Sequence, residues 1–357
     1  MKDRIFIIDG SSYLYRAFHA MPPLSTSSGK PTGAVKGVTN MLMNLKKDSE
    51  GSSIIVVFDA KGKTFRNDIY SDYKANRPPM PDELREQLEP VKSICKAIGF
   101  PLIEISGVEA DDVIATISRM AKEAKYKCVI SSLDKDLMQL VEDPHTTMMD
   151  TMKHKIFNEE GVFEKFGVKP NQIRDMLALV GDSSDNIPGI PKVGQKTAAK
   201  WLKEYGNLEG IKKNADSISG VVGENLRNNL DDLDRNVELV SLKNDVDINL
   251  EFSDLLNFVP DEEELDKIFS ELEFKAADKN KEKERPKKDS NYEIVLDEKA
   301  LKNWAIKINK SKAFAIDTET DSVNTVSANL IGISLSVSEN EGCYIPIAHS
   351  YDGCPKQ

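Results

Sequence analysis

Three carboxylates within four residues, Glu109, Asp111 and Asp112, constrain the fold of this chain more than any other feature. They directly precede the segment 113–124, whose apolar spacing predicts a helix. In that helix Glu109 and Asp112, three residues apart, lie on one face. Carboxylates this close repel one another unless a cation lies among them. A helix start whose acids complement the helix dipole explains this segment equally well when it is taken alone.

Three short apolar runs predict buried strands, and an aspartate follows each of them. The runs are 5–8, 53–58 and 127–132, and the acids that follow are Asp9, Asp59, Asp134 and Asp136. Helical patterns lie between the runs, so we expect a parallel sheet covered on both faces, with ligands bound at the carboxyl ends of its strands. A turn or helix cap explains any one aspartate better, but not three in succession beside an acidic helix start.

A further acidic cluster, Asp182 and Asp185, follows a predicted helix over 172–180. Carboxylate oxygens without histidine or cysteine select hard cations, so we expect Mg²⁺, for which Mn²⁺ can substitute. The four histidines and four cysteines of the chain are scattered and form no C-x-x-C pair. This many acids can hold two ions about 4 Å apart, an arrangement that activates water and stabilises the leaving oxygen in phosphodiester cleavage.

The composition predicts a globular protein of two to three domains. The 357 residues have a net charge of −11, but the nine carboxylates of the predicted site account for −9, which leaves −2 for the rest. Overall acidity is therefore a weak argument against DNA binding. No apolar run approaches the length of a membrane span or signal sequence, and the scattered cysteines fit a reducing compartment. We expect a cytoplasmic monomer with no membrane partner.

Cations and aromatic residues alternate between the second strand and the acidic helix. Arg66, Tyr73, Lys74 and Arg77 belong to this segment. Cations can reach phosphates while tyrosine rings stack on unpaired bases, which suits a single-stranded path. Tyrosines packed on the core of a solvated helix are the alternative, and for Tyr70 it is equally good. Three prolines between 78 and 81 indicate a bend rather than a continuous helix.

A glycine-containing turn followed by a lysine-bearing helix occupies 187–200. Backbone N–H groups in such a turn can hold a phosphate at a helix N-terminus. Lys192, Lys196, Lys200 and Lys203 add attraction to a duplex backbone that does not depend on sequence. A generic helix–turn–helix packing unit is the alternative.

The chain changes character after about residue 275. Residues 279–290 are highly charged and predict a linker, and strands are predicted at 292–296, 313–316, 330–337 and 343–348. Asp317 and Glu319 follow the second of these strands. The 66 residues after the linker are too few to complete an α/β domain, so we expect a fragment without proofreading activity.

These motifs together resemble one family, the 5′ nuclease domain at the amino terminus of bacterial DNA polymerase I, a relative of the flap endonucleases. The matching blocks are 8–12, 57–66, 107–112, 134–136 and 181–191. The segment 317–319 resembles the first motif of the 3′–5′ proofreading domain. The resemblance implies a flap-nuclease-like (PIN-like) α/β sheet flanked by helices, a helix–hairpin–helix subdomain, and a partial ribonuclease-H-like α/β fragment. We therefore expect a nuclease core over 1–180 with an arch at about 62–92, a duplex-binding subdomain over 181–275, a linker over 276–291 and a truncated domain over 292–357.

The resemblance also implies roles for individual residues. One Mg²⁺ is expected on Asp9, Asp59, Glu109 and Asp111, and the second on Asp134, Asp136 and Asp185, with Asp112 and Asp182 close by or bound through water. Tyr73, Lys74 and Arg77 match the arch beside the scissile phosphate, and Arg16 matches another cation of the site. Arg66 is expected to contact DNA. The hairpin residues expected to grip duplex DNA, with a K⁺ ion on their backbone carbonyls, are Gly189, Ile190, Lys192, Val193, Gly194, Lys196, Thr197 and Lys200.

Two residues depart from the family pattern. Leu133 precedes the Asp-Lys-Asp motif where glycine is usual, so the backbone there has less access to positive φ. Lys192 occupies a hairpin position often held by glycine, which puts the K⁺ geometry in question. Neither departure removes a carboxylate.

The function implied is a structure-specific 5′ nuclease that cuts DNA at 5′ ends and 5′ flaps by two-metal-ion catalysis, in primer removal and repair. Its partners would be flap, nicked or branched DNA, with a polymerase domain in cis. A PIN-like ribonuclease and a non-catalytic DNA-junction binder are the alternatives. An aspartate-nucleophile phosphatase is a weaker one, since Ser11 stands where such enzymes want a second aspartate.

Overall fold

The computed structural model describes residues 3–49, 51–150, 155–257, 259–274, 291–322 and 327–350. The chain divides into two compact units, Met1–Ala276 and Ala277–Gln357. The predicted nuclease core and helical subdomain therefore belong to the same unit. The predicted linker lies outside the described residues except for Asn291. Within the described part of the chain, no helix is both long and apolar enough to span a bilayer.

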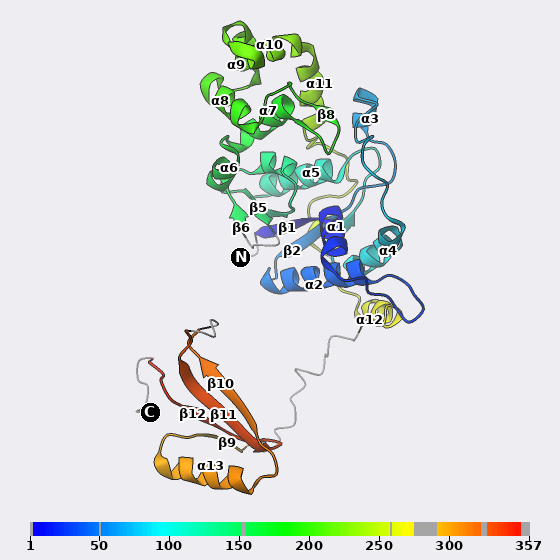
Figure 1. Cartoon of the computed structure of the whole chain (residues 1–357). Coiled ribbons are helices and arrows are strands. Elements are labelled where there is room, and N and C mark those ends of the chain that lie inside the picture. The colour runs from blue at the N-terminus through cyan, green and yellow to red at the C-terminus, as the bar shows by residue number, and fades with distance from the viewer. Residues whose placement is uncertain are drawn as a thin grey trace. The chain divides into compact units, whose positions relative to one another are not determined.

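A six-stranded sheet of order β3-β2-β1-β4-β5-β6 forms the centre of the first unit (Figure 1). Its strands are β1 Arg4–Asp9, β2 Ser53–Val57, β3 Leu102–Ile103, β4 Lys127–Ser131, β5 Thr146–Asp150 and β6 Lys155–Phe157. All neighbouring strands are parallel except β5 and β6. The predicted parallel sheet is confirmed, and its first, second and fourth strands are the three apolar runs identified in the sequence.

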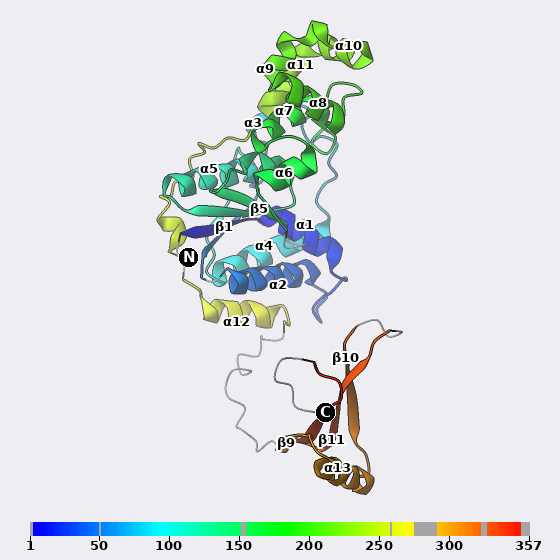
Figure 2. The same cartoon turned by 90° about the vertical axis from the view of Figure 1, so that its left-hand side faces the viewer.

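Helices cover both faces of this sheet, which explains why its central strands are apolar throughout. In β1, Ile5 and Ile7 pack on one side and Phe6 and Ile8 on the other. The first side receives α5 (Ala110–Glu123), and the second receives α1 (Gly10–Ala20), α2 (Gly33–Asp48), α4 (Asp82–Ala97) and α12 (Glu262–Glu271). Figures 1 and 2 show α5 on the opposite side of the sheet from α2 and α4.

The helical part of this unit packs on the same core as α5. Its helices are α6 Glu159–Phe166, α7 Pro170–Val180, α8 Gln195–Tyr205, α9 Leu208–Lys213, α10 Gly220–Asn228 and α11 Leu230–Val240. Short 3₁₀ turns lie at Asp136–Leu140, Ala215–Ser217 and Asp254–Leu256. Leu177, Leu202 and Leu233 are buried in one continuous cluster with Ile114 of α5. This shared cluster holds the hairpin and the acidic helix in one body.

Two glycines allow the chain after α7 to fold back on itself just before the hairpin residues 189–200. Gly181 and Gly189 lie in or beside the ladder between β7 (Gly181–Asp182) and β8 (Ile187–Pro188). Gly181 has a φ of +75°, and a Cβ on Gly189 would lie 1.9 Å from the carbonyl oxygen of Val180. Only glycine fits so close a backbone approach. The acidic loop 182–186 is therefore held between α7 and the hairpin.

The second unit is a four-stranded sheet of order β10-β11-β12-β9 with one helix, α13 (Glu298–Lys310). The strands are β9 Asn291–Ile294, β10 Ala315–Thr320, β11 Leu330–Ser338 and β12 Glu341–Pro346, close to the four predicted strands. Its buried apolar cluster consists of Val295, Trp304 and Cys343. Asp317 and Glu319 lie on β10, whose residues are all exposed.

Candidate functional site

A cavity of about 490 Å³ lies at the carboxyl ends of β1, β2 and β4 in the first unit. Its lining brings together five acids from four separate stretches of sequence and two arch cations. The charged residues of this lining are Asp9, Asp59, Glu109, Asp111, Asp134, Lys74 and Arg77. The prediction that strand-end acids and the acidic helix start share one site agrees with this geometry.

Strand ends and helix starts position the acids of the cavity. Asp9 ends β1 and caps α1, since its Oδ1 accepts a hydrogen bond from the Ser12 N–H at 2.9 Å. Its Oδ2 accepts one from the Ser132 hydroxyl at 2.7 Å. Asp59 follows β2, and its carboxylate accepts hydrogen bonds from the Ser11 hydroxyl at 2.8 Å and the Ala110 N–H at 2.9 Å. Asp9 therefore caps a helix and also lines the cavity.

Glu109, at the start of α5, contacts the arch directly. Its Oε1 lies 2.6 Å from Nζ of Lys74. The Tyr73 hydroxyl lies 3.0 Å from Oε2 of Glu109 and 3.0 Å from Oδ2 of Asp185, and it can donate to only one of them at a time. Tyr73 thus links the two carboxylates. Because its side chain is buried, it has no ring face to offer an unpaired base, contrary to the predicted stacking.

Asp112 is fully buried and faces away from the cavity. Its Oδ1 accepts hydrogen bonds from Arg66 Nη2 at 2.8 Å and from the Lys243 N–H at 2.9 Å. Its Oδ2 accepts from Arg66 Nη1 at 2.7 Å and from the Glu109 N–H at 3.1 Å. Both oxygens are fully used, so of the two expected arrangements Asp112 lies close by, next to Glu109, and its position does not suit binding through water. Arg66 is 1% exposed and offers DNA no surface, so its predicted DNA contact is wrong.

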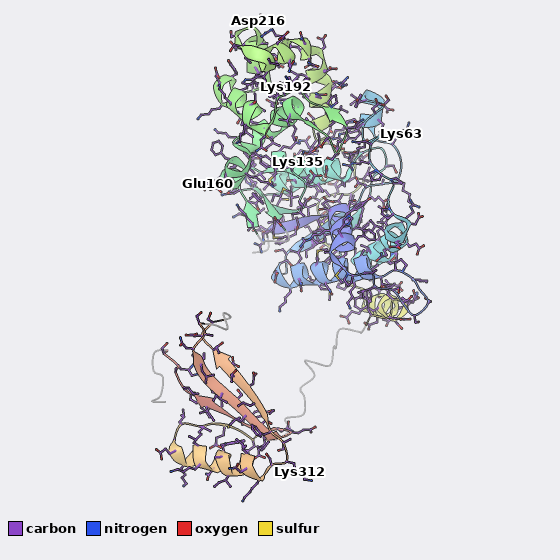
Figure 3. The ribbon with its side chains drawn as sticks, viewed as in Figure 1. Lys63, Lys135, Glu160, Lys192, Asp216 and Lys312 are labelled. Carbon is purple, nitrogen blue, oxygen red and sulfur yellow. The ribbon has the colours of Figure 1, made fainter. Side chains whose placement is uncertain are left out.

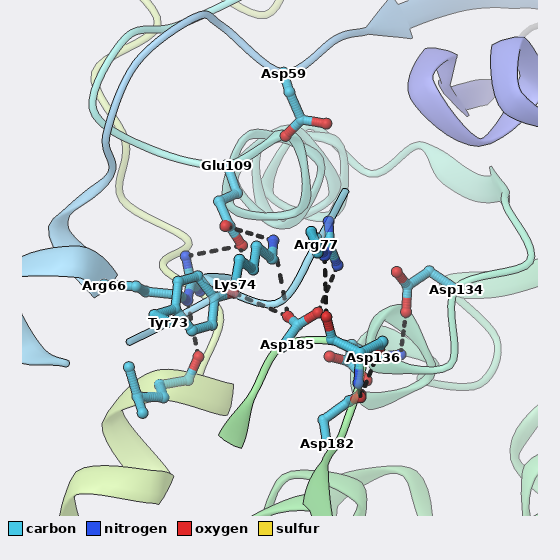
Figure 4. Close-up of polar contacts among 12 residues, drawn as sticks. Asp59, Arg66, Tyr73, Lys74, Arg77, Glu109, Asp134, Asp136, Asp182 and Asp185 are labelled. Atoms are coloured by element: carbon cyan, nitrogen blue, oxygen red, sulfur yellow. Dashed lines mark hydrogen bonds and ion pairs between the residues drawn. The ribbon is translucent and has the colours of Figure 1, made fainter. Parts of the chain in front are cut away.

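A second acidic group lies beside the cavity, around the loop after α7 (Figure 4). Asp134 bridges the two groups, since it lines the cavity and its Oδ1 accepts the Asp136 N–H at 2.9 Å. Lys135 pairs with Asp182 at 2.8 Å, and Arg77 pairs with Asp185 at 2.5 Å. Asp182 and Asp185 are buried and do not line the cavity itself.

Crowding of these carboxylates raises several of their pKa values. Burial, reinforced by Asp59 and Asp134, raises the pKa of Asp9 to about 6. Burial, together with Asp134 and Asp182, raises the pKa of Asp136 to about 8. Burial and the surrounding acids also raise the pKa of Asp111 well above its usual value. Without a cation to compensate them, these groups lose their protons at a higher pH than an isolated carboxyl group does.

The donor set fits a hard divalent cation. It consists of carboxylate oxygens, the pKa values of Asp9 and Asp136 are raised, and Oδ1 of Asp136 is buried with no hydrogen-bond partner. Over the described ranges, however, no three Asp, Glu, His or Cys side chains converge closely enough to hold one ion. Two predicted ligands, Glu109 and Asp185, pair instead with Lys74 and Arg77. These two acids must change partners to bind a metal.

The base of the arch is docked on the acidic loop after α7. It contains the short helix α3 (Phe65–Ile69) and the turn that follows. The Lys74 N–H donates to the Asp185 carbonyl at 2.9 Å, and Lys74 adopts a left-handed φ of 56°. The Asn76 side chain donates to the Ser183 carbonyl at 2.7 Å, and Arg77 Nε donates to that of Ser184 at 3.2 Å. These contacts hold the two arch cations beside the acids.

Arg16 is another predicted site residue that the fold places outside the acid-lined cavity. It lines a separate cavity of about 440 Å³ with Arg4 and Tyr13, between the start of β1 and α1. The acid-lined cavity receives Ser11, Ser12 and Tyr15 from α1 instead. The predicted catalytic role of Arg16 therefore lacks support from its position.

In the hairpin, the apolar residues and the lysines point in different directions. Ile190 and Val193 are buried, and the Ile190 N–H donates to the Leu179 carbonyl at 2.8 Å. Lys192, Lys196 and Lys200 are exposed, and Figure 3 shows Lys192 in the helical part of the unit. Ile190 and Val193 therefore anchor the turn, and the lysine side chains form its outer surface.

Leu133 and Lys192, the two residues that depart from the family pattern, differ in backbone conformation. Leu133 is not among the residues with positive φ, so a side chain there causes no strain. Lys192 has a φ of 66°, the left-handed conformation that glycine adopts most easily. The hairpin thus retains the backbone shape that glycine would give.

Sequence reasoning missed four residues of the site. Ser11 and Ser132 bind the carboxylates of Asp59 and Asp9, and both stand within two residues of a strand-end aspartate, which is a usable signal. Lys135 pairs with Asp182 from inside the Asp-Lys-Asp motif. Lys243, whose N–H binds Asp112, lies far along the chain in a segment without local signal.

A parallel sheet with carboxylates at its strand ends, a cationic arch and a helical hairpin is typical of a nuclease class, and comparisons with known proteins agree. Residues 4–167 match the family model of the 5′-3′ exonuclease N-terminal resolvase-like domain, and 168–264 match that of its C-terminal SAM fold. Residues 292–353 match the 3′-5′ exonuclease model. The 5′-3′ exonuclease of Aquifex aeolicus is 45% identical over 279 residues, covering 78% of this chain and 95% of that protein. This chain belongs to the 5′-3′ exonuclease family.

The same region occurs in longer relatives. DNA polymerase I of Pseudomonas aeruginosa is 45% identical over 373 residues, covering 99% of this chain. The chain spans 41% of that polymerase. Among solved structures, T5 5′-exonuclease with bound zinc ions aligns with a TM-score of 0.58 and 25% identity, covering 75% of this chain and 98% of that one. A T5 D15 flap endonuclease variant in complex with DNA and metal ions aligns with a TM-score of 0.57 and 25% identity, covering 76% and 99%.

Proposed function

We propose that residues 1–276 hydrolyse phosphodiester bonds of DNA at 5′ ends and at the base of 5′ flaps. The observation that supports this most is the cavity in which five carboxylates from distant stretches of sequence meet Lys74 and Arg77. Acids suited to divalent cations and cations suited to phosphate are the two components that phosphodiester cleavage requires.

Two Mg²⁺ ions are the proposed cofactors, and Mn²⁺ can replace them. Asp9, Asp59, Glu109 and Asp111 would hold one, and Asp134, Asp136 and Asp185 the other. Ions bound there would lower the pKa of water and offset the charge of the phosphate. Asp182, paired with Lys135, would orient the second group rather than bind directly.

The arch residues have separate tasks in this proposal. Lys74 and Arg77, now paired with Glu109 and Asp185, would exchange these carboxylates for phosphate oxygens as DNA and metal enter. Their charge would then stabilise the negative charge that develops on the phosphate. Tyr73, buried between Glu109 and Asp185, would hold both carboxylates in the orientation that metal binding needs.

The substrate form follows from where the cations lie. Duplex DNA would bind the exposed lysines of the hairpin, with a K⁺ ion on the hairpin carbonyls, and the single strand would follow the arch. The junction would then lie at the acid-lined cavity, which suits flap, nicked or branched DNA. Primer removal and repair, as a monomer and with a polymerase domain in cis, are the proposed context.

A cleavage assay tests this proposal. The chain is incubated with a labelled 5′-flap duplex, a blunt duplex and single-stranded RNA, each with Mg²⁺ or with chelator. We expect metal-dependent cutting of the flap substrate and little cutting of the RNA.

Two alternatives predict different outcomes of the same assay. Equal cutting of the RNA would favour a PIN-like ribonuclease, although the hairpin with its lysines has no purpose in that reading. Tight binding of the flap without cutting would favour a non-catalytic junction binder, and either outcome would overturn the proposal.

A further inference from the structure

Arg66 is a fully buried cation whose hydrogen bonds reach three parts of the chain. Both Nη atoms bind Asp112, at 2.7 and 2.8 Å. Its Nε donates to the Leu239 carbonyl and its Nη2 to the Ser241 carbonyl, each at 2.8 Å. Leu239 lies near the end of α11, and Ser241 directly follows that helix. Arg66 therefore connects the base of the arch, the acidic helix α5 and the end of α11.

Asp112 completes this connection from the other side. Its carboxylate also accepts the Lys243 N–H at 2.9 Å and the Glu109 N–H at 3.1 Å. The bond to the Glu109 N–H fixes the backbone from which the Glu109 side chain enters the cavity. Of the four hydrogen bonds to this carboxylate, two come from Arg66, one from the Glu109 backbone and one from the segment after α11.

The same guanidinium also acts on the Glu109 carboxylate directly. Arg66 Nη1 lies 3.5 Å from Glu109 Oε2, too far for a short hydrogen bond but close enough for strong attraction in a buried setting (Figure 4). Lys74 binds the other oxygen of Glu109, but its side chain is 24% exposed. The Lys74 ammonium can therefore move away from Glu109 when another cation binds, whereas the buried guanidinium of Arg66 stays in place.

A buried ion pair needs a reason beyond stability, because apolar residues of similar volume often stabilise a protein as well. The planar fork of arginine fixes both the direction and the distance of its partners, which an apolar contact does not. This pair lies between a carboxylate of the cavity and the helical part that bears the hairpin. The geometry of the pair is suited to holding the Glu109 carboxylate and the helical part in a fixed relative orientation.

We propose that Arg66 and Asp112 are positioning residues that hold Glu109 in place for metal binding and tie it to the end of α11. The acidic helix and the helical hairpin part then keep one alignment, so DNA held by the hairpin meets Glu109 in a fixed register. This inference rests on the proposed nuclease function, and it assigns neither residue a contact with DNA or metal.

The test compares Arg66→Lys with the unaltered chain. Lysine keeps the buried charge but cannot make the bidentate contact or reach both carbonyls. We expect the affinity for Mn²⁺, titrated calorimetrically without DNA, to fall by about 10-fold, and kcat on a 5′-flap duplex to fall similarly. KM and duplex affinity should stay within about twofold, because the lysines of the hairpin are untouched.

Arg119→Lys is the matched control. Arg119 also ties α5 to the segment after α11, since its Nε donates to the Asn244 carbonyl at 2.6 Å, but no contact links it to Glu109. We expect this variant to retain the Mn²⁺ affinity and kcat of the unaltered chain. Equal losses in both variants would show a general loosening of α5 and would overturn the proposal.

Asp112→Asn provides the second variant, since it keeps the shape and removes the charge. It should lose metal affinity and kcat together, as Arg66→Lys does. If Arg66→Lys melts at a lower temperature but keeps Mn²⁺ affinity and kcat, the pair is merely structural and the proposal is wrong. Failure of the unaltered chain to cut the flap would instead count against the nuclease function.

Discussion

Asp134 is the residue on which the two acidic groups depend, because it lines the cavity and also accepts the Asp136 N–H. We expect Asp134→Ala to lower kcat on a 5′-flap duplex by on the order of 100-fold or more, since a proposed ligand of the second ion is lost from the lining of the cavity. Duplex affinity should remain, because the hairpin lysines lie elsewhere. Cleavage kinetics and fluorescence anisotropy measure the two effects.

Glu160→Ala is a suitable control for charge, since Glu160 is an exposed acid at the start of α6. It should leave both measurements unchanged. Loss of duplex binding in Asp134→Ala alongside the loss of cleavage would show that the carboxylate supports the fold rather than the reaction.

Metal binding should depend on pH through Asp9 and Asp136, whose pKa values are raised to about 6 and about 8. A carboxylate must lose its proton before it binds a cation, so binding releases protons. We expect Mg²⁺ affinity to fall as pH is lowered from 8.5 to 5.5, by up to about tenfold per pH unit for each proton displaced. Calorimetry in buffers of different ionisation enthalpy measures the affinity and the proton release.

The same raised pKa values set the sign for the stability of the metal-free chain. Between the unfolded value of 3.8 and the folded value of about 8, the folded state binds more protons at Asp136. The stability that Asp136 contributes to the folded state is therefore fully present below pH 3.8 and is lost as pH rises through about 8. Asp136→Asn removes the carboxyl group whose proton a metal ion displaces at this pH. This variant should flatten the pH dependence of Mg²⁺ affinity above pH 7. An unchanged profile in that variant would contradict the assignment.

Residue chemistry was predictable from sequence where the signal was local. Asp9 and Asp59 follow apolar runs, and the sheet joins such strand ends at one edge. Arg66 shows the opposite case. In a basic segment it resembles a surface cation, but its four partners lie on Asp112, Leu239 and Ser241, and no local pattern marks a contact between such distant residues.

Among the elements, the hairpin offers the sharpest test because Lys192 adopts a left-handed φ of 66°. Glycine takes this conformation at little cost, whereas a Cβ there is strained, so Lys192→Gly should change the free energy of unfolding by no more than about 1 kcal/mol. The exposed ammonium is lost, however. Duplex affinity should fall, and the slope of log affinity against log salt should become shallower by about one unit.

Lys192→Ala is the control. A charge-removing glycine elsewhere, such as Lys213→Gly in α9, would also destabilise a helix. Alanine removes the charge but keeps a Cβ, so it should weaken duplex binding as much as glycine does while retaining the strain. Unchanged salt dependence in both variants would show that Lys192 does not face the phosphates.

Helices and strands with strong apolar periods were predictable, but their docking was less so. The strand runs reappear as β1, β2 and β4, and the predicted helices over 113–124 and 172–180 as α5 and α7. Three prolines correctly indicated a break between α3 and α4. The docking of the arch on the loop 182–186 was not predictable, because it depends on backbone carbonyls of Ser183, Ser184 and Asp185 that have no sequence signature.

For the whole molecule, charge predicted a linker from residue 276, since a segment with so few apolar residues cannot bury a core, and the two compact units meet between Ala276 and Ala277. The family resemblance implied a nuclease core that ends at 180 and a separate helical subdomain, whereas both lie in one compact unit. Their union depends on apolar contacts such as those of Leu177 and Leu233 with Ile114 in one cluster. Contacts between residues this far apart in sequence leave no mark in a local pattern.

The two units should unfold separately, and the two tryptophans of the chain report on one unit each: Trp201 on the first and Trp304 on the second. The second unit has a buried cluster of only three residues, so its stability should be marginal. In Trp201→Phe the remaining fluorescence should therefore change at a urea midpoint at least about 1 M below that of Trp304→Phe. Because each variant alters the unit whose signal is lost, the reporting unit stays intact. Coincident midpoints would mean that the units fold as one cooperative body.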